Sequence, residues 1–298
     1  MTVLVKSGYV TIIGRPNVGK STLLNAMVGQ KVSITSRRPQ TTRHRIVGVS
    51  TKKHSQIAYV DTPGLHLGKG RVINRLMNRA ASGAVLGVDC VVMLIAATGW
   101  KKADERVLEL FQNQDVPVVL VANKMDLLSR RQDLLPLIQE SRQRYDFADI
   151  VPVSAVKRTN LDQLEAVLLQ QLPEQPPLFP QDQLTDRSDR FIAAELVREQ
   201  VFRKMGQEIP YAVAVEIEAF KIKNKILHIN ALIWVEKKGQ KGIIIGKGGE
   251  SLKKIGTAAR KEMEAFYHKK VNLGLWVKVR EGWSNNERAL RSFGYGEE

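Results

Sequence analysis

The chain has 298 residues, 43% hydrophobic and 26% charged, which is long enough for two domains and excludes an intrinsically disordered protein. No apolar run approaches the roughly 18 residues of a membrane-spanning helix, and the N-terminus lacks a secretory signal, so we expect a cytoplasmic protein. The net charge of +16 favours a polyanionic partner or an anionic surface, while one cysteine and five unclustered histidines exclude a disulfide framework and predict no structural zinc.

Short β-branched runs alternate with helix-like segments over the first 172 residues. The runs cover residues 9–14, 56–61, 90–97, 116–123 and 149–154, and the helical patterns cover 21–30, 104–114 and 160–172. Continuous apolar strands between amphipathic helices predict a parallel sheet covered on both faces, a doubly wound α/β domain over residues 1–172. Cys90 falls in one of these strands, where we expect a buried small hydrophobe rather than a reactive thiol.

A glycine-lysine loop, GRPNVGKS, joins the first predicted strand to the first predicted helix and matches the P-loop pattern GxxxxGK[ST]. Backbone N–H groups and a helix N-terminus would bind phosphates there, Lys20 would reach the β and γ oxygens, and Ser21 would offer its hydroxyl to Mg²⁺. The predicted phosphate-binding residues are Gly14, Arg15, Pro16, Asn17, Val18, Gly19, Lys20, Ser21 and Thr22.

The motif DTPG follows the apolar strand QIAYV, so its carboxylate emerges at the edge of the sheet beside the first loop. Asp61 can hold Mg²⁺ through water, and the backbone N–H of Gly64 can turn to the γ-phosphate. Thr62 and Pro63 belong to the same predicted nucleotide-binding loop.

The motif NKMD follows the strand VPVVLVA and is suited to reading a base. The Asp126 carboxylate can accept hydrogen bonds from N1–H and the 2-amino group of guanine, whereas adenine offers no donor at either position. The wrong base would leave a buried charge unpaired, and sites of this kind discriminate by roughly 10⁴ to 10⁵. The later strand end VPVSAVK would close a loop over the base. The predicted base-site residues are Asn123, Lys124, Asp126, Ser154, Ala155 and Val156.

In this order and spacing, GRPNVGKS, QTTRHRI, DTPGL, NKMD and SAVK resemble the Era family of bacterial GTPases. The resemblance implies a switch that hydrolyses GTP to GDP and phosphate with Mg²⁺, in which Lys20, Gly64 and a threonine assist. It implies that Thr41 or Thr42 coordinates Mg²⁺ when the γ-phosphate is present, and the sequence alone does not choose between them. Loss of that phosphate would free the segment that carries them.

The residue after DTPG is Leu65, where many small GTPases carry a glutamine that orients the attacking water. Leucine has no polar atom for this task, so we expect slow intrinsic hydrolysis, with water positioned by backbone groups, by Thr41 or Thr42, or by a partner. In related GTPases with an apolar residue here, an asparagine matching Asn17 is associated with bound K⁺. Similarity therefore adds K⁺ as a candidate cofactor.

The stretch PEQPPLFP has four prolines in eight residues and cannot continue a helix or a sheet, so it predicts a linker over residues 173–186. A different pattern follows over 187–298: a helix at 187–204, strands at 212–220 and 226–236 joined by a turn at Asn224, and a last strand at 271–280. This order predicts an α+β domain with an antiparallel start. We expect Trp234 and Trp276 to fill its core rather than to stack on bases.

A second glycine-lysine stretch, KGIIIGKGGESLKKIG, lacks GK[ST] and a later base-reading motif, so a second nucleotide site is not expected. It contains GxxG, a turn that lets a nucleic-acid backbone come close. Leu252, Ile255, Ala259, Met263 and Phe266 then form one apolar stripe of a helix, with basic residues elsewhere on it.

Together the loop and the basic helix predict a groove for single-stranded RNA, with bases against an apolar floor made by Ile243, Ile244 and Ile245. Residues 221–280 carry 15 Lys and Arg against 4 Glu, which suits this partner. The predicted RNA-binding residues are Ile245, Gly246, Lys247, Gly248, Gly249, Lys253 and Lys254.

Helix, two strands, helix, GxxG, helix and strand is the order of a type II KH domain, which is also the second domain of Era. The resemblance covers residues 9 to 293 and implies binding to the 3′ end of 16S rRNA during maturation of the 30S ribosomal subunit. We expect a monomer. Two alternatives stay open. One is a cell-cycle regulator bound peripherally to the inner membrane, and the other is a different ribosome-assembly or tRNA-modification GTPase of the same superfamily.

Overall fold

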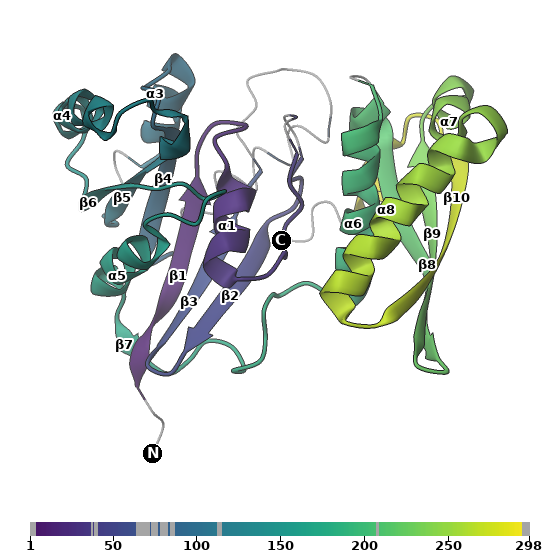
Figure 1. Ribbon diagram of the computed structural model, residues 1–298, viewed down its shortest axis with the longest axis horizontal. Helices are drawn as coiled ribbons and strands as arrows, with labels where there is room; N and C mark the ends of the chain where they lie inside the picture. Colours follow the sequence, from purple (N-terminus) through teal and green to yellow (C-terminus); the bar gives the residue numbers. More distant parts are fainter. Residues whose placement is uncertain are drawn as a thin grey trace. The chain divides into compact units, whose positions relative to one another are not determined.

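The computed structural model describes residues 4–36, 38, 41–63, 72, 77, 83, 87–111, 115–206 and 209–293. The chain divides into two compact units (Figure 1). The N-terminal unit comprises Met1–Ser33, Thr42–Leu67 and Met77–Asp186, and the C-terminal unit comprises Ile34–Thr41, Gly68–Leu76 and Arg187–Glu298. A short segment of the N-terminal half, Ile34–Thr41, therefore belongs to the C-terminal unit. Within the described residues no helix is long and apolar enough to cross a bilayer.

The N-terminal unit is built on a sheet with strand order β2-β3-β1-β4-β5-β6. Five strands are parallel, and β2 pairs antiparallel with β3 at one edge. The strands are β1 (Val5–Ile13), β2 (Ile46–Lys52), β3 (Ser55–Asp61), β4 (Cys90–Ala96), β5 (Val118–Asn123) and β6 (Asp149–Pro152). Every residue of β3, β4 and β5 is buried, as expected for strands covered on both faces.

Helices cover both faces of this sheet: α1 (Lys20–Val28), α3 (Lys102–Leu108), α4 (Leu134–Arg144) and α5 (Leu161–Gln171). Val91, Met93 and Ile95 pack with α3 and α4 in one apolar cluster. The alternate residues of β4, such as Val92 and Leu94, are equally buried and point to the opposite face, because side chains alternate along a strand. The predicted doubly wound fold is confirmed. Strand β2 and helix α4 were not predicted.

The proline-rich stretch does join the sheet, contrary to the expectation. Strand β7 (Glu174–Gln175) pairs antiparallel with the start of β1. Pro176 and Pro177 directly follow β7, so their missing N–H groups are not needed in the pairing. Farther on, Phe179 exchanges two hydrogen bonds of 2.9 Å with the Gln56 side chain, and Val49 donates to the Leu184 carbonyl. The stretch is thus an ordered strap along the N-terminal unit rather than a free tether.

The C-terminal unit has a three-stranded sheet of order β10-β9-β8. Strands β8 (Val213–Lys223) and β9 (Ile226–Val235) form an antiparallel hairpin, and β10 (Lys270–Val279) lies parallel to β9. Asn224 and Lys225 turn the hairpin with φ of 51° and 63°, the positive values of a type I′ turn, which confirms the predicted turn.

The helices of this unit are α6 (Asp189–Lys204), α7 (Lys238–Ile245), α8 (Glu250–Tyr267) and α9 (Glu287–Ser292). The Ser188 side chain caps α6 by accepting from Phe191 N. Helices α6 and α8 lie on the same face of the sheet (Figure 1), and their apolar residues share one core with the strands. In that core Ile255, Ala259 and Met263 are fully buried, as the sequence predicts for the stripe of α8.

The tryptophans depart from the expectation. Trp276 is 48% exposed and Trp234 is only half-buried, with its Nε1 donating to Glu216, so the prediction that both fill the core was wrong. Trp276 adjoins the buried Val277 in β10 and therefore points to the opposite face. Trp283 is the fully buried tryptophan, and it donates to the Ala212 carbonyl.

Candidate nucleotide and RNA sites

The phosphate loop connects β1 to α1, and two of its glycines have no room for a side chain. A Cβ on Gly14 would lie 2.5 Å from the Leu94 carbonyl oxygen, and a Cβ on Gly19 would lie 2.4 Å from Asn123 Nδ2. Gly19 also has a φ of 106°, a conformation that side chains rarely adopt. The glycines of the motif are therefore required by packing as well as by close approach to phosphate.

Lys20 is buried inside this loop. Its Nζ donates to the carbonyl oxygens of Gly14 and Arg15 at 2.9 and 3.2 Å, so the cation lies over the loop backbone. Burial lowers the pKa of Lys20 to about 8, against the opposing attraction of Asp61. A triphosphate would provide the missing negative partners and stabilise the charged form, so the residue fits the predicted phosphate contact.

Four side-chain oxygens gather at the end of β3. Asp61 Oδ2 accepts hydrogen bonds from Ser21 Oγ at 2.7 Å, Ser33 Oγ at 2.9 Å and Thr42 Oγ1 at 3.4 Å. Asp61 Oδ1 is buried and has no hydrogen-bond partner within the described part of the chain. Burial raises the pKa of this carboxyl, while Lys20 and the three hydroxyls oppose the rise. A carboxylate with surrounding hydroxyls is the oxygen-rich set that suits Mg²⁺.

The two candidate threonines have different surroundings. Thr42 Oγ1 lies 2.8 Å from Ser21 Oγ, inside the cluster with Asp61. The Thr41 hydroxyl instead donates to the Arg38 carbonyl at 2.8 Å and lies 2.6 Å from Ser36 Oγ. The geometry favours Thr42 as the metal ligand. Gly64 and Leu65 lie outside the described residues.

The predicted base-reading motif also braces the phosphate loop. Asn123 Nδ2 donates to the Val18 carbonyl at 2.8 Å, and its Oδ1 accepts from Ala155 N at 3.0 Å. Lys124 donates from Nζ to the Asn17 carbonyl at 2.6 Å. These hydrogen bonds bring three separate loops, GRPNVGKS, NKMD and SAVK, together at one edge of the sheet, as the sequence predicts.

Asp126 is held by the Ser154 hydroxyl, which donates to its Oδ1. The carboxylate is exposed in the protein without nucleotide. Only the base itself can remove this carboxylate from water, and the cost of a wrong base arises when it binds. The adjacent Val156 is also exposed, where a base would cover it.

Two further residues of this site carried no sequence signal. Asp104, on α3, is buried and forms an ion pair with Arg15 Nε at 3.1 Å, which ties the phosphate loop to that helix. Ser33 donates to Asp61 although it belongs to no motif. Of the other predicted residues, Thr62 is buried and donates to the Ile12 carbonyl, and Pro63 is buried beside it.

In the C-terminal unit the GxxG turn links α7 to α8. Gly246, Gly248 and Gly249 have φ of 73°, 59° and 80°. A Cβ on Gly246 would lie 2.7 Å from that of Ser251, whereas Gly248 and Gly249 face open space. The last two glycines are thus needed for backbone conformation and leave the backbone accessible to a phosphate.

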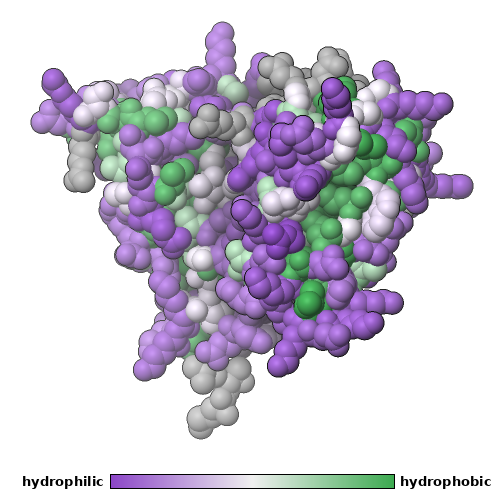
Figure 2. Space-filling view, turned by 45° about the vertical axis from the view of Figure 1, so that its right-hand side comes forward, coloured by the Kyte–Doolittle hydropathy of each residue, from purple (hydrophilic) through white to green (hydrophobic). Residues whose placement is uncertain are grey.

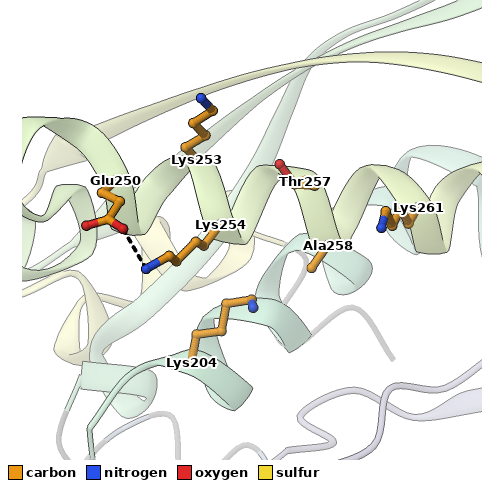
Figure 3. Close-up of a pocket in the computed structure, with 7 residues that line it drawn as sticks. All are labelled: Lys204, Glu250, Lys253, Lys254, Thr257, Ala258 and Lys261. Atoms are coloured by element: carbon orange, nitrogen blue, oxygen red, sulfur yellow. Dashed lines mark ion pairs between the residues drawn. The ribbon is translucent and has the colours of Figure 1, made fainter.

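A basic pocket adjoins this turn along α8 (Figure 3). In Figure 3 Lys254 extends from α8 toward Glu250, with which it forms an ion pair at 2.8 Å, and Lys253 extends from the other side of α8. Lys204 on α6 lines the same pocket. Lys204 was not predicted, because its place beside the GxxG turn is a product of tertiary packing. The pocket in Figure 3 is lined by Lys204, Glu250, Lys253, Lys254, Thr257, Ala258 and Lys261. A second pocket shares Lys204, Glu250 and Lys254 with it and is also lined by Gly246, Lys247 and Ser251 of the turn.

The expected apolar floor is only partly present. Ile243 is 57% exposed on α7, but Ile244 is fully buried in the core and Ile245 is packed against it. Ile244 is not available to a base because it is fully buried in the core. Successive helical residues point about 100° apart, so Ile243 and Ile244 cannot face the same surface. Figure 2 shows hydrophobic side chains gathered into a band with hydrophilic ones around it, and Ile243 and Trp276 are the exposed large apolar residues of α7 and β10. No three His, Cys, Asp or Glu side chains gather as a metal site within the described ranges.

Comparison with known proteins agrees with this geometry. Residues 9–124 match a family model described as 50S ribosome-binding GTPase, and residues 208–284 match a KH domain model. The chain is 53% identical to GTPase Era of Pseudomonas aeruginosa, over 98% of this chain and 96% of that protein. It is 54% identical to GTPase Era of Coxiella burnetii, over 97% and 98%.

Two solved structures are similar to the whole chain, each with a TM-score of 0.94 at 41% identity over 98% of this chain and 99% of the other. One is a variant of Era from Aquifex aeolicus bound to GDP and AlF₄⁻, and the other is Era in complex with MgGDPNP and nucleotides 1506–1542 of 16S ribosomal RNA. Sequence identity to these Era proteins exceeds 50% over almost the full length of both chains, so the similarity includes the phosphate loop as well as the GxxG turn. The chain belongs to the Era family of GTPases.

Proposed function

We propose that this chain is a GTP-hydrolysing switch that binds the single-stranded 3′ end of 16S rRNA during assembly of the small ribosomal subunit. The observation that carries the proposal is the presence of two different anion sites in one chain. The first is a phosphate loop braced by the guanine-reading motif, and the second is a GxxG turn beside a cluster of lysines. A relative that holds MgGDPNP and a 16S rRNA fragment together supports the pairing of these ligands.

In the nucleotide site, Ser21, Thr42 and Asp61 would hold Mg²⁺, which when bound neutralises charge on the β- and γ-phosphates. Lys20 would bind the same phosphates, and Asp126 would accept the two guanine donors. Similarity adds K⁺ near Asn17, whose backbone carbonyl already accepts from Lys124. We assign the nucleotide domain to residues 1–172 and the RNA-binding domain to 187–298, with the strap between them.

Equilibrium binding tests the proposal directly. The protein should bind GDP and GTP at least a hundredfold more tightly than ADP or ATP, and should bind an oligonucleotide of the 16S rRNA 3′ end more tightly than a scrambled one. RNA affinity should fall with salt, because Lys and Arg side chains that bind phosphates release counterions. ATP binding at a strength comparable to GTP, or failure to bind RNA at low ionic strength, would contradict it.

If GTP and RNA favour the same state of the protein, each must tighten the other by an equal factor. RNA affinity should therefore be higher with MgGDPNP than with GDP. Equal RNA affinities in the two nucleotide states would remove this coupling and leave the two sites independent.

We place the protein in the cytoplasm, with peripheral contact at the inner membrane as a second location supported by the net charge of +16. Flotation with anionic and neutral vesicles tests the second location. Replacing Gly248 and Gly249 by Asp should lower RNA affinity more than tenfold, because the GxxG backbone is where RNA would bind. Vesicle binding should change much less, because the net charge falls only by two from +16.

A further inference from the structure

Helix α6 carries three charged side chains that are almost completely buried. Glu195, Arg198 and Glu199 are 7%, 1% and 0% exposed. Charged residues are rarely buried unless they are paired and hydrogen-bonded, because removing a charge from water is costly. Positions 195, 198 and 199 lie on one side of a helix, three and four residues apart. Their partners include the backbone of the segment Ile34–Thr41, which belongs to the same compact unit.

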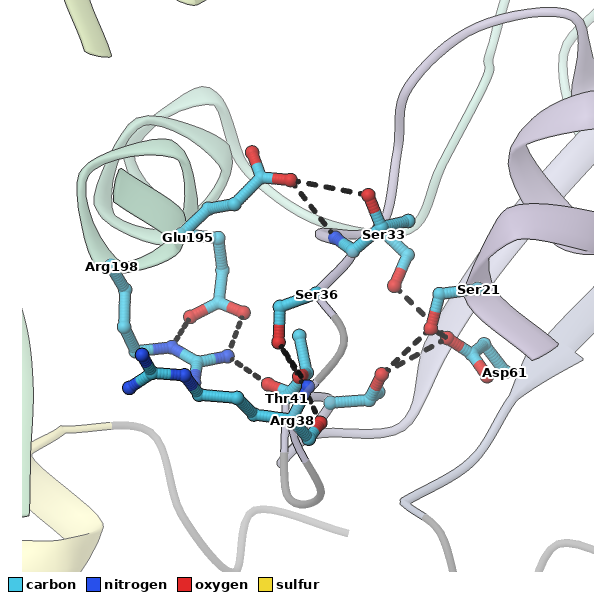
Figure 4. A network of polar contacts seen from close by, with 11 residues as sticks. Ser21, Ser33, Ser36, Arg38, Thr41, Asp61, Glu195 and Arg198 are labelled. Atoms are coloured by element: carbon cyan, nitrogen blue, oxygen red, sulfur yellow. Dashed lines mark hydrogen bonds and ion pairs between the residues drawn. The ribbon is translucent and has the colours of Figure 1, made fainter. Parts of the chain in front are cut away.

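Arg198 holds the end of this segment (Figure 4). Its Nη2 donates to the Thr41 carbonyl oxygen at 2.5 Å, and its Nε and Nη2 each donate to a Glu195 carboxylate oxygen at 2.6 Å. The two-point contact with Glu195 fixes the plane of the guanidinium. Arg198 is therefore oriented from one side by a carboxylate and presents a donor to Thr41 on the other.

The beginning of the segment is held by the same face of α6. Glu199 Oε1 accepts from Thr35 N at 3.0 Å and from Arg203 Nη2 at 2.8 Å. Arg38, between the two ends, donates to the carbonyl oxygens of Met205 and Gly206 just after the helix. The segment is thus attached at its start, its middle and its end.

The attachment of Thr41 constrains the next residue. The Thr41 carbonyl and the Thr42 nitrogen belong to one planar peptide group, so a donor that fixes the carbonyl also fixes the direction in which the chain enters Thr42. The Thr42 hydroxyl lies 2.8 Å from Ser21 Oγ and 3.4 Å from Asp61 Oδ2. One peptide bond therefore separates the contact with Arg198 from the cluster that suits Mg²⁺.

We propose that Arg198, oriented by Glu195, is a positioning residue for the nucleotide site: by holding the Thr41–Thr42 peptide group it presents the Thr42 hydroxyl to Mg²⁺ when a triphosphate is bound. This inference rests on the proposed metal role of Thr42. It makes helix α6 a determinant of the preference for the triphosphate over the diphosphate. The resemblance to Era links Thr41 or Thr42 to Mg²⁺ only when the γ-phosphate is present, and the contacts with Ser21 and Asp61 favour Thr42.

Two variants of the full chain test the inference. Exchanging Glu195→Leu and Arg198→Met together removes both members of the buried ion pair, a replacement that proteins often tolerate without loss of stability. Arg198→Lys keeps a positive charge beside Glu195 but lacks the planar fork. Thr42→Ala is the reference variant. Affinities for MgGDPNP and GDP are measured by fluorescent-nucleotide titration, with thermal unfolding and RNA binding as controls of fold.

We expect both α6 variants to lose about tenfold in MgGDPNP affinity, within the range of known coupling between sites. GDP affinity should change less than twofold, and adding Thr42→Ala to either variant should cause no further loss. Unchanged MgGDPNP affinity in the α6 variants, or losses that multiply with that of Thr42→Ala, would overturn the inference. If Thr42→Ala alone leaves MgGDPNP affinity unchanged, the metal role assigned to Thr42 fails instead, and the inference fails with it.

Discussion

Replacing Asp126 by Asn should convert the guanine preference of the nucleotide site. In the structure the Asp126 carboxylate is exposed, held by the Ser154 hydroxyl, and adjacent to the loops braced by Asn123. Guanine offers it two donors, N1–H and the 2-amino group. An asparagine of the same shape can accept from one of them through its carbonyl but presents N–H against the other.

The magnitude follows from what happens to these two hydrogen bonds with guanine. A hydrogen bond to a charged group contributes roughly 1.5 to 3 kcal/mol, so weakening one bond and removing the other should cost about 3 kcal/mol, or roughly 150-fold in affinity. Xanthine carries a carbonyl oxygen in place of the 2-amino group, which accepts from the new amide. The variant should therefore bind xanthosine diphosphate more tightly than GDP.

Competition titration of GDP, xanthosine diphosphate and ADP against a fluorescent nucleotide measures these preferences. Because Asp126 is exposed and Asn can still accept from Ser154, unfolding free energy should change by less than about 0.5 kcal/mol. A variant that still binds GDP within threefold of the parent would refute the assignment of Asp126 as the reader of guanine.

Three other outcomes are expected. Gly19→Ala should abolish nucleotide binding and lower the unfolding free energy by about 1 to 3 kcal/mol, because the new Cβ would collide with Asn123 and position 19 has a φ of 106°. GDP affinity equal to that of the parent would contradict this. Asp at both Gly248 and Gly249 should lower RNA affinity more than tenfold in a filter-binding assay, because the new charges repel the RNA backbone and both positions have a positive φ that Asp strains. GDP affinity should stay constant, and unchanged RNA affinity would contradict the assignment of the GxxG turn. Burial raises the pKa of Cys90 to about 12, which leaves a thiolate fraction of about 10⁻⁴ at pH 8. Thiol reagents should therefore label Cys90 only at the rate of unfolding. Fast labelling of the native protein would show that β4 is accessible.

Predictions that depended on contiguous residues were confirmed in the fold. The strand–loop–helix around the first glycine loop, the Asn224 turn and the buried stripe of α8 each arise from patterns within one short segment. Some predictions of which face of a strand or helix a residue occupies were wrong. Trp276 and Ile244 were assigned to the wrong environments, because the apolar character of a residue does not say which face it occupies.

The strap shows the same limit in another form. Its prolines correctly exclude a long helix or strand, yet Glu174, Gln175 and Phe179 still pair with distant strands through hydrogen bonds that no local pattern indicates. Strand β2 was not predicted for a similar reason. It pairs antiparallel at the edge of an otherwise parallel sheet, and this pairing depends on β3 rather than on a pattern within β2 itself.

The sequence by itself determined the motifs: a glycine loop ending in a lysine and a serine at the start of a helix, an NKMD motif that predicts guanine binding, and a GxxG turn in a basic domain. These are short-range features, because the geometry of a loop depends mainly on its own residues. Only the tertiary structure decided which threonine joins Asp61 and which side chain donates to the preceding Thr41 carbonyl. Arg198 lies 157 residues from Thr41 along the chain, and no motif joins them. A buried guanidinium needs hydrogen-bond acceptors beyond its ion pair with Glu195, and the Thr41 carbonyl is one of them.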